Sequence, residues 1–395
     1  MNRMKRLLPV LVLLLAGSAA FAATFDEIPF MAMSPGILGR GGSEIADARG
    51  YDALFTNPAG FSRDPSAFTL SSTTSWVYAR PDQFLGLVGQ FAAGTSSAST
   101  LLTFMNDQVT RGGLGAGAAW GIGYVGGGLG LGASLILDST LSGPSLLGVT
   151  GNLTGTMGFI VGLSVPIDVA GFKVHVGGDV RPMIRVHAPL PNSVAVGMLD
   201  ALANGGDVLA SLGTASTFYG VGIGLDAGAI AELGWFNVGI SIRDLAGTQF
   251  RYNTSSFSAV QSAITSSLQF PTTGTLVTAD QYTIPMDIGV GLNFHPDFGT
   301  LNNIVDPSIS LEMHDIVGAL AGTASPWTLL RAGAETRLFS FFTVRGGLNQ
   351  GFLTAGAGLK LLFFDLNFAV FTRELGLHVG DQPLSGMTMD ASIRW

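Results

Sequence analysis

The chain has 395 residues, of which 47% are hydrophobic and only 12% are charged, whereas a soluble domain carries roughly 25% charged residues. After the N-terminus no run reaches the ~18 apolar residues of a transmembrane helix, so a closed β-barrel is the way left for this chain to cross a bilayer. The formal net charge of −8 argues against nucleic acid as a partner.

Residues 1–22 are predicted to be a signal peptide that directs export. They combine a basic start, the apolar core Leu7–Leu15 and the small-residue cleavage site Ala20-Phe21-Ala22. No cysteine follows, which excludes a lipoprotein anchor. Loss of three positive charges moves the net charge from −8 to −11. We expect three regions: the signal peptide at 1–22, an N-terminal hatch at 23–65 and a transmembrane barrel at 66–395.

The stretch from Gly36 to Phe61, GILGRGGSEIADARGYDALFTNPAGF, is too irregular and glycine-rich for a strand. We interpret it as a plug folded inside a barrel, with Asn57-Pro58-Ala59-Gly60 as its closing turn. Pro58 fixes its own φ and drives Asn57 toward extended geometry, and Gly60 can supply a backbone angle that other residues resist. An ordinary loop before the first strand fits the residues equally well.

Fourteen alternating segments are predicted to be barrel strands. In the last of them, odd positions from Met387 to Trp395 are apolar and even positions from Thr388 to Arg394 are polar. A soluble sandwich has the same period, so the signal peptide and the low charge are needed to favour a membrane barrel. The segments are 66–78, 113–125, 128–140, 155–167, 172–185, 216–229, 234–245, 283–294, 306–316, 327–338, 341–349, 352–362, 365–373 and 385–395.

The segment Phe84–Phe91 is placed in the first outer loop and not counted as a fifteenth strand, because bacterial barrels have even strand numbers with short periplasmic turns. The long connections 79–112, 141–154, 186–215 and 246–282 then all lie outside. Two of them contain candidate helices, at 194–212 and 256–268, with apolar residues three or four apart. We expect these helices to form a lid over the barrel or an apolar groove that captures a ligand. The candidate groove residues are Met198, Leu199, Leu202, Phe257, Val260, Ile264 and Leu268.

Glycines gather on one face of three of the predicted strands. The GxGxxG at Gly121–Gly126 is not followed by a helix, so a dinucleotide site is excluded by its context. A wall without side chains leaves room for a plug or a ligand, and glycine also marks bends in strands. These glycines are Gly115, Gly117, Gly121, Gly123, Gly128, Gly130, Gly132, Gly220, Gly222 and Gly224.

The inward positions also collect ionisable groups, which we interpret mainly as a network that holds the plug to the wall. A minority of the arginines could bind a carboxylate headgroup. The inward set is Lys173, His175, Asp179, Arg181, Arg243, Asp287, Glu312, His314, Arg331, Glu335, Arg337 and Arg345. No GxSxG, HExxH or paired histidine spacing occurs, so we expect neither catalysis, nor a metal, nor a cofactor. A Ser-His-acid site assembled in space stays open as an alternative.

The stretch Ser34-Pro35-Gly36 with Gly39-Arg40, followed by Asp52-Ala53-Leu54-Phe55 and Asn57-Pro58-Ala59-Gly60, resembles the hatch of the FadL/TodX family of outer-membrane transporters. Phe61 departs from the usual Leu or Met after this motif. The resemblance implies a fourteen-stranded barrel plugged by its hatch, with Gly39, Arg40, Asn57, Pro58, Ala59 and Gly60 in the gating segment.

The resemblance further implies capture between the third and fourth outer loops, and lateral exit at a kinked third strand, here at Gly128, Gly130 and Gly132. We therefore expect passive uptake of hydrophobic small molecules, with long-chain fatty acids first. The expected partners are that ligand, outer-membrane lipids and the barrel-assembly machinery, which would read the terminal Trp395, and the chain is expected to be a monomer. The alternative from another class is a barrel scaffold that docks partners of a secretion or envelope complex.

Overall fold

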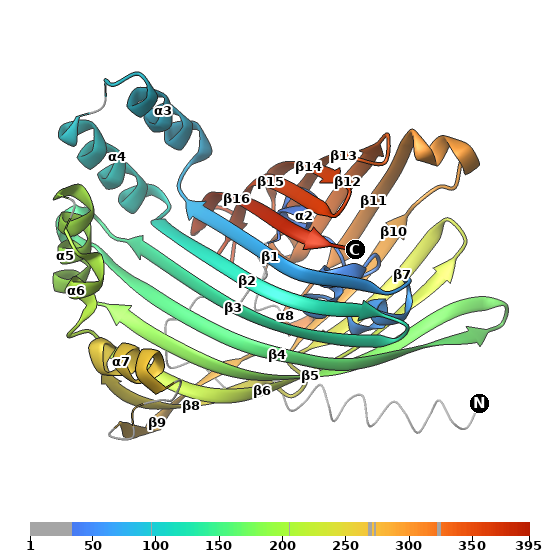
Figure 1. Cartoon of the computed structure of the whole chain (residues 1–395), viewed down its shortest axis with the longest axis horizontal. Helices are drawn as coiled ribbons and strands as arrows, with labels where there is room; N and C mark the ends of the chain where they lie inside the picture. The colour runs from blue at the N-terminus through green and yellow to red at the C-terminus, as the bar shows by residue number, and fades with distance from the viewer. Residues whose placement is uncertain (1–33, 96, 205, 268–270, 272–273, 322–324) are drawn as a thin grey trace.

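The computed structural model describes residues 34–95, 97–204, 206–267, 271, 274–321 and 325–395. The predicted signal peptide and the first part of the predicted hatch lie outside these residues. Sixteen strand segments make up one sheet (Figure 1). They are β1 (Ala67–Tyr78), β2 (Leu114–Gly126), β3 (Leu129–Ser142), β4 (Thr150–Val169), β5 (Phe172–Leu190), β6 (Ser216–Leu233), β7 (Phe236–Arg243), β8 (Thr248–Ser256), β9 (Thr275–Ile284), β10 (Asp287–Phe294), β11 (Val305–Met313), β12 (Leu330–Leu338), β13 (Phe342–Asn349), β14 (Phe352–Leu361), β15 (Phe364–Glu374) and β16 (Pro383–Arg394).

The sheet closes on itself as an antiparallel barrel. β1 pairs with both β2 and β16, and β5 pairs with β6, so the ring has no end. β7 and β8 both pair with β6, while β10 pairs with β7 and β9 pairs with β8. β7 and β8 therefore share one strand position in the wall, and β9 and β10 share the next one. Each of these two positions is interrupted once along its length. The wall is fourteen strands around, and this confirms the predicted strand number.

The expected loop at 246–282 is wrong in part, because β8 and β9 continue the wall there. Outward positions of β8, such as Gln249 and Arg251, are polar and exposed, while Phe250 and Tyr252 are buried. This is the reverse of the pattern expected next to lipid, since that face is apolar in a membrane barrel. We infer that this hairpin lies beyond the apolar belt of the barrel. Because its outward residues are polar, its sequence does not show the alternation typical of a membrane strand.

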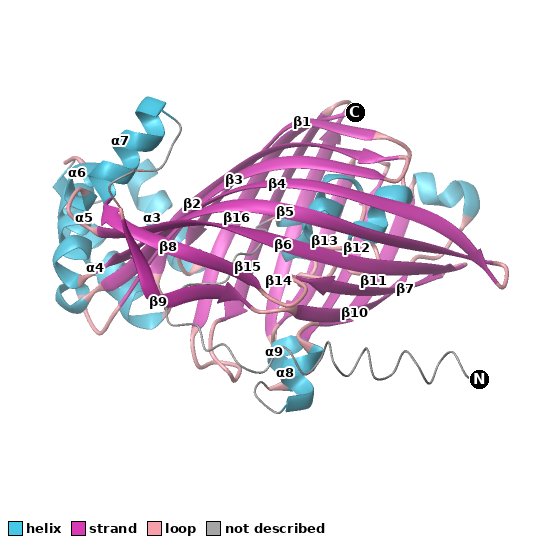
Figure 2. Ribbon diagram, turned by 90° about the horizontal axis from the view of Figure 1, so that it is seen from below, coloured by secondary structure: helices cyan, strands magenta, loops and turns pink. Residues whose placement is uncertain are grey.

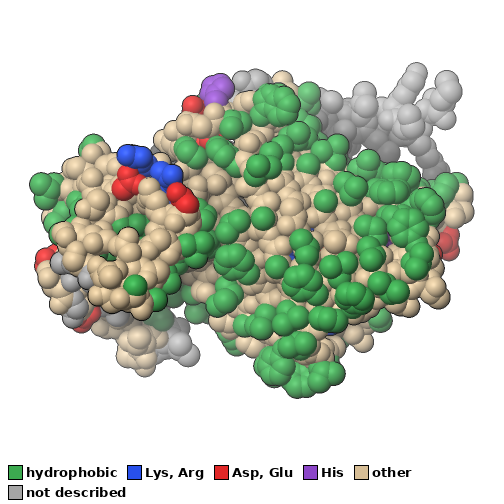
Figure 3. Space-filling view, turned by 90° about the horizontal axis from the view of Figure 1, so that it is seen from above, with side chains coloured by type: hydrophobic (Ala, Val, Ile, Leu, Met, Phe, Trp, Pro, Cys, Tyr) green, Lys and Arg blue, Asp and Glu red, His purple; other side chains and the backbone are tan. Residues whose placement is uncertain are grey.

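The outer face of the ring is apolar. In β4 every second residue is exposed and hydrophobic, from Met157 through Phe159 to Ile167. Figure 3 shows hydrophobic side chains spread over the strand wall. No helix among the described residues is long and apolar enough to cross a membrane. A closed antiparallel barrel with an apolar outside is the architecture of bacterial outer-membrane proteins.

The two rims of the barrel differ. One rim carries short turns, such as those at 170–171, 234–235 and 362–363, with the 3₁₀ turn η4 (Gly299–Asn303) in the longest of them. The other carries the helices (Figures 1 and 2). These are α3 (Pro81–Ala92), α4 (Ala98–Arg111), η3 (Leu146–Gly148), α5 (Asn192–Asn204), α6 (Val208–Leu212), α7 (Phe257–Ser267), α8 (Ile316–Ala321) and α9 (Pro326–Leu329). Short turns face the periplasm in such barrels, so the helical rim is the outer one.

The helices at the outer rim agree with two of the predictions and add to them. The predicted helix at 194–212 is α5 followed by α6, and the helix predicted at 256–268 is α7. Phe84–Phe91 is not a strand, as expected, but lies in the helix α3. Helix α4 was not predicted.

Residues 34–65, here called the plug segment, lie inside the ring (blue in Figure 1). The segment contains α2 (Pro35–Gly39) and the 3₁₀ turns η1 (Gly50–Phe55) and η2 (Pro58–Ser62). Its apolar residues, among them Leu54, Phe55 and Phe61, form a buried cluster with Val125, Ile160 and Ile230 of the wall. The plug segment thus forms the centre of the core in this part of the barrel.

Candidate functional site

Glycines in the wall make the space that the plug segment occupies. A Cβ on Gly130 or Gly162 would stand 2.6 Å from the ring of Phe61, and one on Gly123 or Gly132 would stand 2.8 Å from Leu54. Since real Cβ atoms essentially never come closer than 3 Å to another heavy atom, a side chain at these wall positions would push the plug away. The glycine face of β2 and β3 that the sequence predicts is therefore the surface on which the plug packs.

Asn57 ties the plug together and to the wall. Its Nδ2 donates to the carbonyls of Ile45 at 2.9 Å and Ile240 at 3.1 Å, and its Oδ1 accepts from the Ala59 amide at 3.1 Å. The side chain is fully buried, so each of these groups would lose a partner without it. The residue is the N-cap of η2, with Pro58 as the first residue of that turn. The predicted closing turn is therefore the start of a 3₁₀ helix.

Gly60 has a different role from the one predicted. It is absent from the residues with positive φ, so it does not supply an unusual backbone angle. A Cβ there would come 2.6 Å from the Ala48 carbonyl oxygen and 2.9 Å from Ala53 Cβ. Glycine is needed because two parts of the plug segment approach each other closely at this point.

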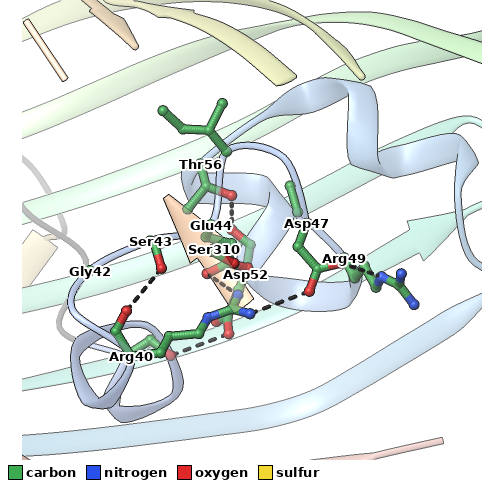
Figure 4. Close-up of polar contacts among 12 residues, drawn as sticks. Arg40, Gly42, Ser43, Glu44, Asp47, Arg49, Asp52, Thr56 and Ser310 are labelled. Carbon is green, nitrogen blue, oxygen red and sulfur yellow. Dashed lines mark hydrogen bonds and ion pairs between the residues drawn. The ribbon is translucent and has the colours of Figure 1, made fainter. Parts of the chain in front are cut away.

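Gly39 and Arg40 lie where the plug meets β12, β13 and β14. Thr354 Oγ1 donates to the Gly39 carbonyl at 3.2 Å and accepts from the Gly41 amide at 3.1 Å. The buried guanidinium of Arg40 lies 3.3 Å from Asp47 and 3.6 Å from Glu44 (Figure 4). The predicted gating residues are thus all buried within the barrel, and their role in gating stays a prediction.

Asp47 is the centre of a cluster of cations in the plug segment. Arg49 lies at 3.0 Å, Arg40 at 3.3 Å and Arg63 at 3.6 Å. Burial opposes ionisation of Asp47, but these three arginines outweigh it and lower its pKa. Arg63 also pairs with Glu232 of β6 at 3.2 Å, so the cluster is joined to the wall.

Glu44 behaves in the opposite way. Burial raises the pKa of its carboxyl well above the usual range, and the nearby charge of Asp52 raises it further against the opposing effect of Arg40. Its Oε2 atom accepts no hydrogen bond in the described part of the chain. In the described part of the chain its nearest basic partner is Arg40, 3.6 Å away.

Two neighbouring cavities lie between the plug and the wall near Glu44. The first, of about 60 Å³, is lined by Ile37, Gly42, Glu44, Ile45, Phe55, Thr56, Ser241, Arg243, Asp287, Gly289, Glu312, His314 and Arg331. The second, of about 200 Å³, is lined by Gly36, Arg40, Glu44, Asp47, Arg49, Asp52, His295, Asp306, Ser308, Glu335, Arg337 and Arg345. Many of the predicted inward ionisable residues are thus brought together here.

Three of the seven predicted groove residues belong to an apolar cluster at the outer rim, called the outer cluster. Met198 and Leu199 of α5 are buried in it beside Met105 of α4, and Phe257 of α7 packs against it. Val260 is buried and Ile264 half-buried on α7. The Leu202 side chain and Leu268 lie outside the described residues. The cluster is closely packed in this structure, so ligand capture there requires the helices to separate.

The third wall strand, β3, shows no opening. All fourteen of its residues from Leu129 to Ser142 pair with β4 in one unshifted register, and thirteen pair with β2. Gly130 and Gly132 face the plug, while Gly128 lies in the turn before the strand with φ of 87°. An exit at these glycines therefore requires strand separation, and it stays a prediction.

An aromatic cluster above the plug was not predicted. Phe250, Tyr252 and Tyr282 of the β8–β9 hairpin are buried with Met183 of β5. The Arg185 guanidinium lies 5.0 Å from the Tyr282 ring centroid and donates to Thr156 Oγ1 at 2.9 Å. The only signal in the sequence was the alternation of 248–254, which the polar outward positions disguise.

A serine, a histidine and an acid do converge, but at the periplasmic side of the plug. Ser62 Oγ lies 2.7 Å from His175 Nδ1, and His175 Nε2 lies 3.5 Å from Glu232 Oε1. Glu232 is also engaged by Arg63, and Ser62 lines none of the cavities described here. We assign the group to holding η2 against β5 and β6. Among the described residues no group of three His, Asp or Glu side chains could hold a metal ion.

No protein-family model matches the chain, and no curated protein sequence matches it. Solved structures of outer-membrane proteins do match it, and three of them are described here. The chain is similar to the toluene transporter TodX of Pseudomonas putida, with 14% identity over 94% of this chain and 99% of that one and a TM-score of 0.45. It is similar to the toluene transporter TbuX of Ralstonia pickettii, with 13% identity, 91% and 97% coverage and a TM-score of 0.46.

The third is a FadL homologue of Pseudomonas aeruginosa, with 12% identity, 93% and 99% coverage and a TM-score of 0.42. All three are outer-membrane proteins of the family that the hatch motif resembles.

Proposed function

We propose that the protein takes up hydrophobic small molecules passively across the outer membrane, and that long-chain fatty acids are the first ligands to test. The observation that supports this most is the apolar outer cluster above a barrel whose lumen is closed by a buried plug. A barrel that passed polar nutrients would need neither feature, because an open aqueous lumen serves that purpose.

Capture is the first step of the proposed mechanism. The outer cluster brings apolar side chains of α4, α5 and α7 together at the outer rim, where an amphipathic ligand arrives. Such a ligand can replace contacts between the helices with contacts to its own apolar surface. Burial of that surface stabilises the complex by about 25 cal/mol per Å². Met198 and Met105 suit this exchange, since methionine adapts its shape to different partners.

Passage is the second step and requires the plug segment to move. The aromatic cluster of Phe250, Tyr252 and Tyr282 lies between the outer rim and the plug and offers an apolar wall to the ligand. The plug segment then has to leave its glycine-lined seat. Exit into the bilayer at Gly130 and Gly132 of β3 is the route that the family resemblance implies.

A second function, a barrel scaffold that docks partners, is favoured by one observation. The lumen at the level of the plug is filled, and the cavities beside the plug are lined mainly by charged residues. A scaffold needs a stable, filled barrel and no apolar path past the plug.

Uptake of a labelled long-chain fatty acid by cells that lack their own transporter decides between the two. We expect uptake with the native chain and a several-fold loss with Leu199→Asp, which buries a charge in the outer cluster. Leu320→Asp is the matched control, because Leu320 is 83% exposed on the same rim and should leave uptake unchanged. A native barrel that is assembled at normal levels and takes up neither fatty acids nor aromatic hydrocarbons would overturn the transport proposal.

A further inference from the structure

Glu44 lines two neighbouring cavities between the plug segment and the wall. The cavity of about 60 Å³ and that of about 200 Å³ have this one residue in common. Their other lining residues come from different parts of the plug and wall. Glu44 is therefore the residue at which the two cavities adjoin.

The smaller cavity lies toward the outer rim. Arg243 is the last residue of β7, Asp287 is the first of β10, and Arg331 is the second of β12. His314 directly follows β11. All four side chains therefore stand where the short strands of the wall end on the outer side.

The larger cavity leads to the periplasmic side. It shares Arg49, His295, Asp306 and Arg337 with a third cavity of about 480 Å³. That cavity is also lined by residues of the short turns, namely Gly234, Asp297, Asn302, Asn303 and Ser340. Together the three cavities extend from the outer ends of β7 and β10–β12 to the short-turn rim, and Glu44 lies where the first two adjoin.

The side chain of Glu44 is held lightly compared with the rest of the plug. Its carboxylate lies 3.6 Å from Arg40 Nη2, and its Oε2 accepts no hydrogen bond in the described structure although the residue is only 4% exposed. Its neighbours are fixed by other groups. Arg331 donates to the Gly42 carbonyl at 3.2 Å, and Glu312 accepts from the Ile45 amide at 2.5 Å. The side chain can therefore rotate without undocking the plug.

We propose that the barrel conducts water and small ions along this polar path, and that the Glu44 side chain is its gate. The path lies on the β10–β12 side of the lumen, whereas the apolar face of the plug packs against β2 and β3. Hydrophobic ligands and ions would thus use opposite sides of the plug. Since acidic and basic side chains line the path together, we expect weak selectivity between cations and anions.

Conductance of the purified protein in planar lipid bilayers tests the proposal. In molar potassium chloride we expect small currents from the native barrel and a several-fold larger conductance from Glu44→Ala, because the side chain that closes the path is removed. Asp64→Ala is the matched control, as Asp64 is a carboxylate of the plug segment that lines none of the three cavities. A Glu44→Ala barrel that conducts no better than the native one overturns the proposal.

The absence of cysteine from the chain allows a second test that does not depend on Glu44→Ala folding well. The thiol of a Glu44→Cys variant should react with a small, charged methanethiosulfonate added to the folded barrel, and the reaction should change the current. The thiol of Leu54→Cys, in the apolar core of the plug, should stay unreactive. An unreactive thiol at position 44 counts against the path. Both readouts are independent of fatty acid uptake, so this proposal and the transport proposal can fail separately.

Discussion

Gly347 of β13 faces the peptide of Gly41 in the plug segment so closely that a Cβ on Gly347 would overlap the Gly41 amide nitrogen. The next residue along the strand, Gly346, faces the other way, and a Cβ there would meet only the Thr354 carbonyl oxygen at 4.0 Å. Two adjacent glycines thus differ only in the side of the wall to which they point.

The first prediction uses this pair. Gly347→Ala should displace the turn at Gly41 and weaken plug docking by about 1–3 kcal/mol, the usual cost of overpacking. Gly346→Ala should change docking by less than about 0.5 kcal/mol, as for a surface substitution. Hydrogen exchange of residues 34–65 in the detergent-solubilised barrel measures the difference as a loss of protection. Equal protection in the two variants would show that the close contact between Gly347 and Gly41 does not affect the free energy of plug docking.

The second prediction concerns Asn57. Asn57→Ala removes two buried hydrogen bonds and one part-buried hydrogen bond, and the carbonyls of Ile45 and Ile240 lose Asn57 as a donor, at a cost of about 1–3 kcal/mol for an unsatisfied buried group. Asn57→Asp keeps the acceptor for the Ala59 amide but places an anion against the same two carbonyls.

We therefore expect Asn57→Asp to be at least as harmful to plug protection as Asn57→Ala, even though it keeps the N-cap. If Asn57→Asp retains native protection, the N-cap hydrogen bond with the Ala59 amide is sufficient for plug docking. The two hydrogen bonds that Asn57 Nδ2 donates would then contribute nothing to docking. Heat-modified migration of the barrel on gels is the control that the wall itself is assembled in both variants.

The strand count and the glycine-lined wall could be predicted from the sequence because both follow from period-two alternation. In β2 and β3 the apolar residues alternate with glycine, so one pattern indicates the lipid face and the plug face at once. The same logic failed at 248–256, where the outward positions Gln249 and Arg251 face water above the belt and the pattern is inverted. The interruption before β8 has positive φ at Asp244, Ala246 and Gly247, and of these only Ala246 is a residue type that rarely adopts this conformation.

Many of the ionisable residues that line the cavities beside Glu44 were predicted to face inward, but the cavities themselves could not be predicted. The residues that line them come from the plug and from four or more strands. These residues lie up to hundreds of positions apart in the sequence and come together only in the closed barrel. Arg40 was singled out by the motif, but the opposite pKa shifts of its two acidic neighbours follow from how many arginines surround each of them. Asp47 has three arginines around it, whereas Glu44 has one.

The third prediction follows from the raised pKa of the Glu44 carboxyl. Burial is the main cause, and the groups that face Glu44 are Asp52, Arg40 and Asp47 of the plug and Glu312 of β11. The docked plug binds a proton at Glu44 over a pH range in which an undocked plug has released it. By linkage, docking is then strongest on the acid side of that range and weakens as the pH rises through it.

Protection factors of residues 34–65 should accordingly fall between mildly acidic and alkaline pH in the native barrel. Glu44→Gln, which is uncharged at every pH, should abolish the slope. The lowered pKa of Asp47 acts in a more acidic range, where docking is lost as the pH falls, so the two effects separate on the pH axis. A slope that persists unchanged in Glu44→Gln would assign it to another group.

The last prediction concerns the close packing of the Phe61 ring against Gly130. The Phe61 ring lies where Cβ atoms of Gly130 and Gly162 would be, 2.6 Å away in both cases, so Gly130→Ala should weaken plug docking by about 1–3 kcal/mol. Phe61→Leu shortens the side chain at that place and should lose part of the packing energy by itself.

In the double variant the alanine at position 130 fills part of the space that the smaller side chain leaves. The two changes should therefore be less harmful together than their sum, with a coupling of about 0.5–3 kcal/mol typical of residues in contact. Gly346→Ala combined with Phe61→Leu is the control, and it should be additive because Gly346 does not face the plug. Additive effects for Gly130 and Phe61 would mean that β3 yields to the new methyl group, which is the behaviour expected of a strand that can bend away from the plug.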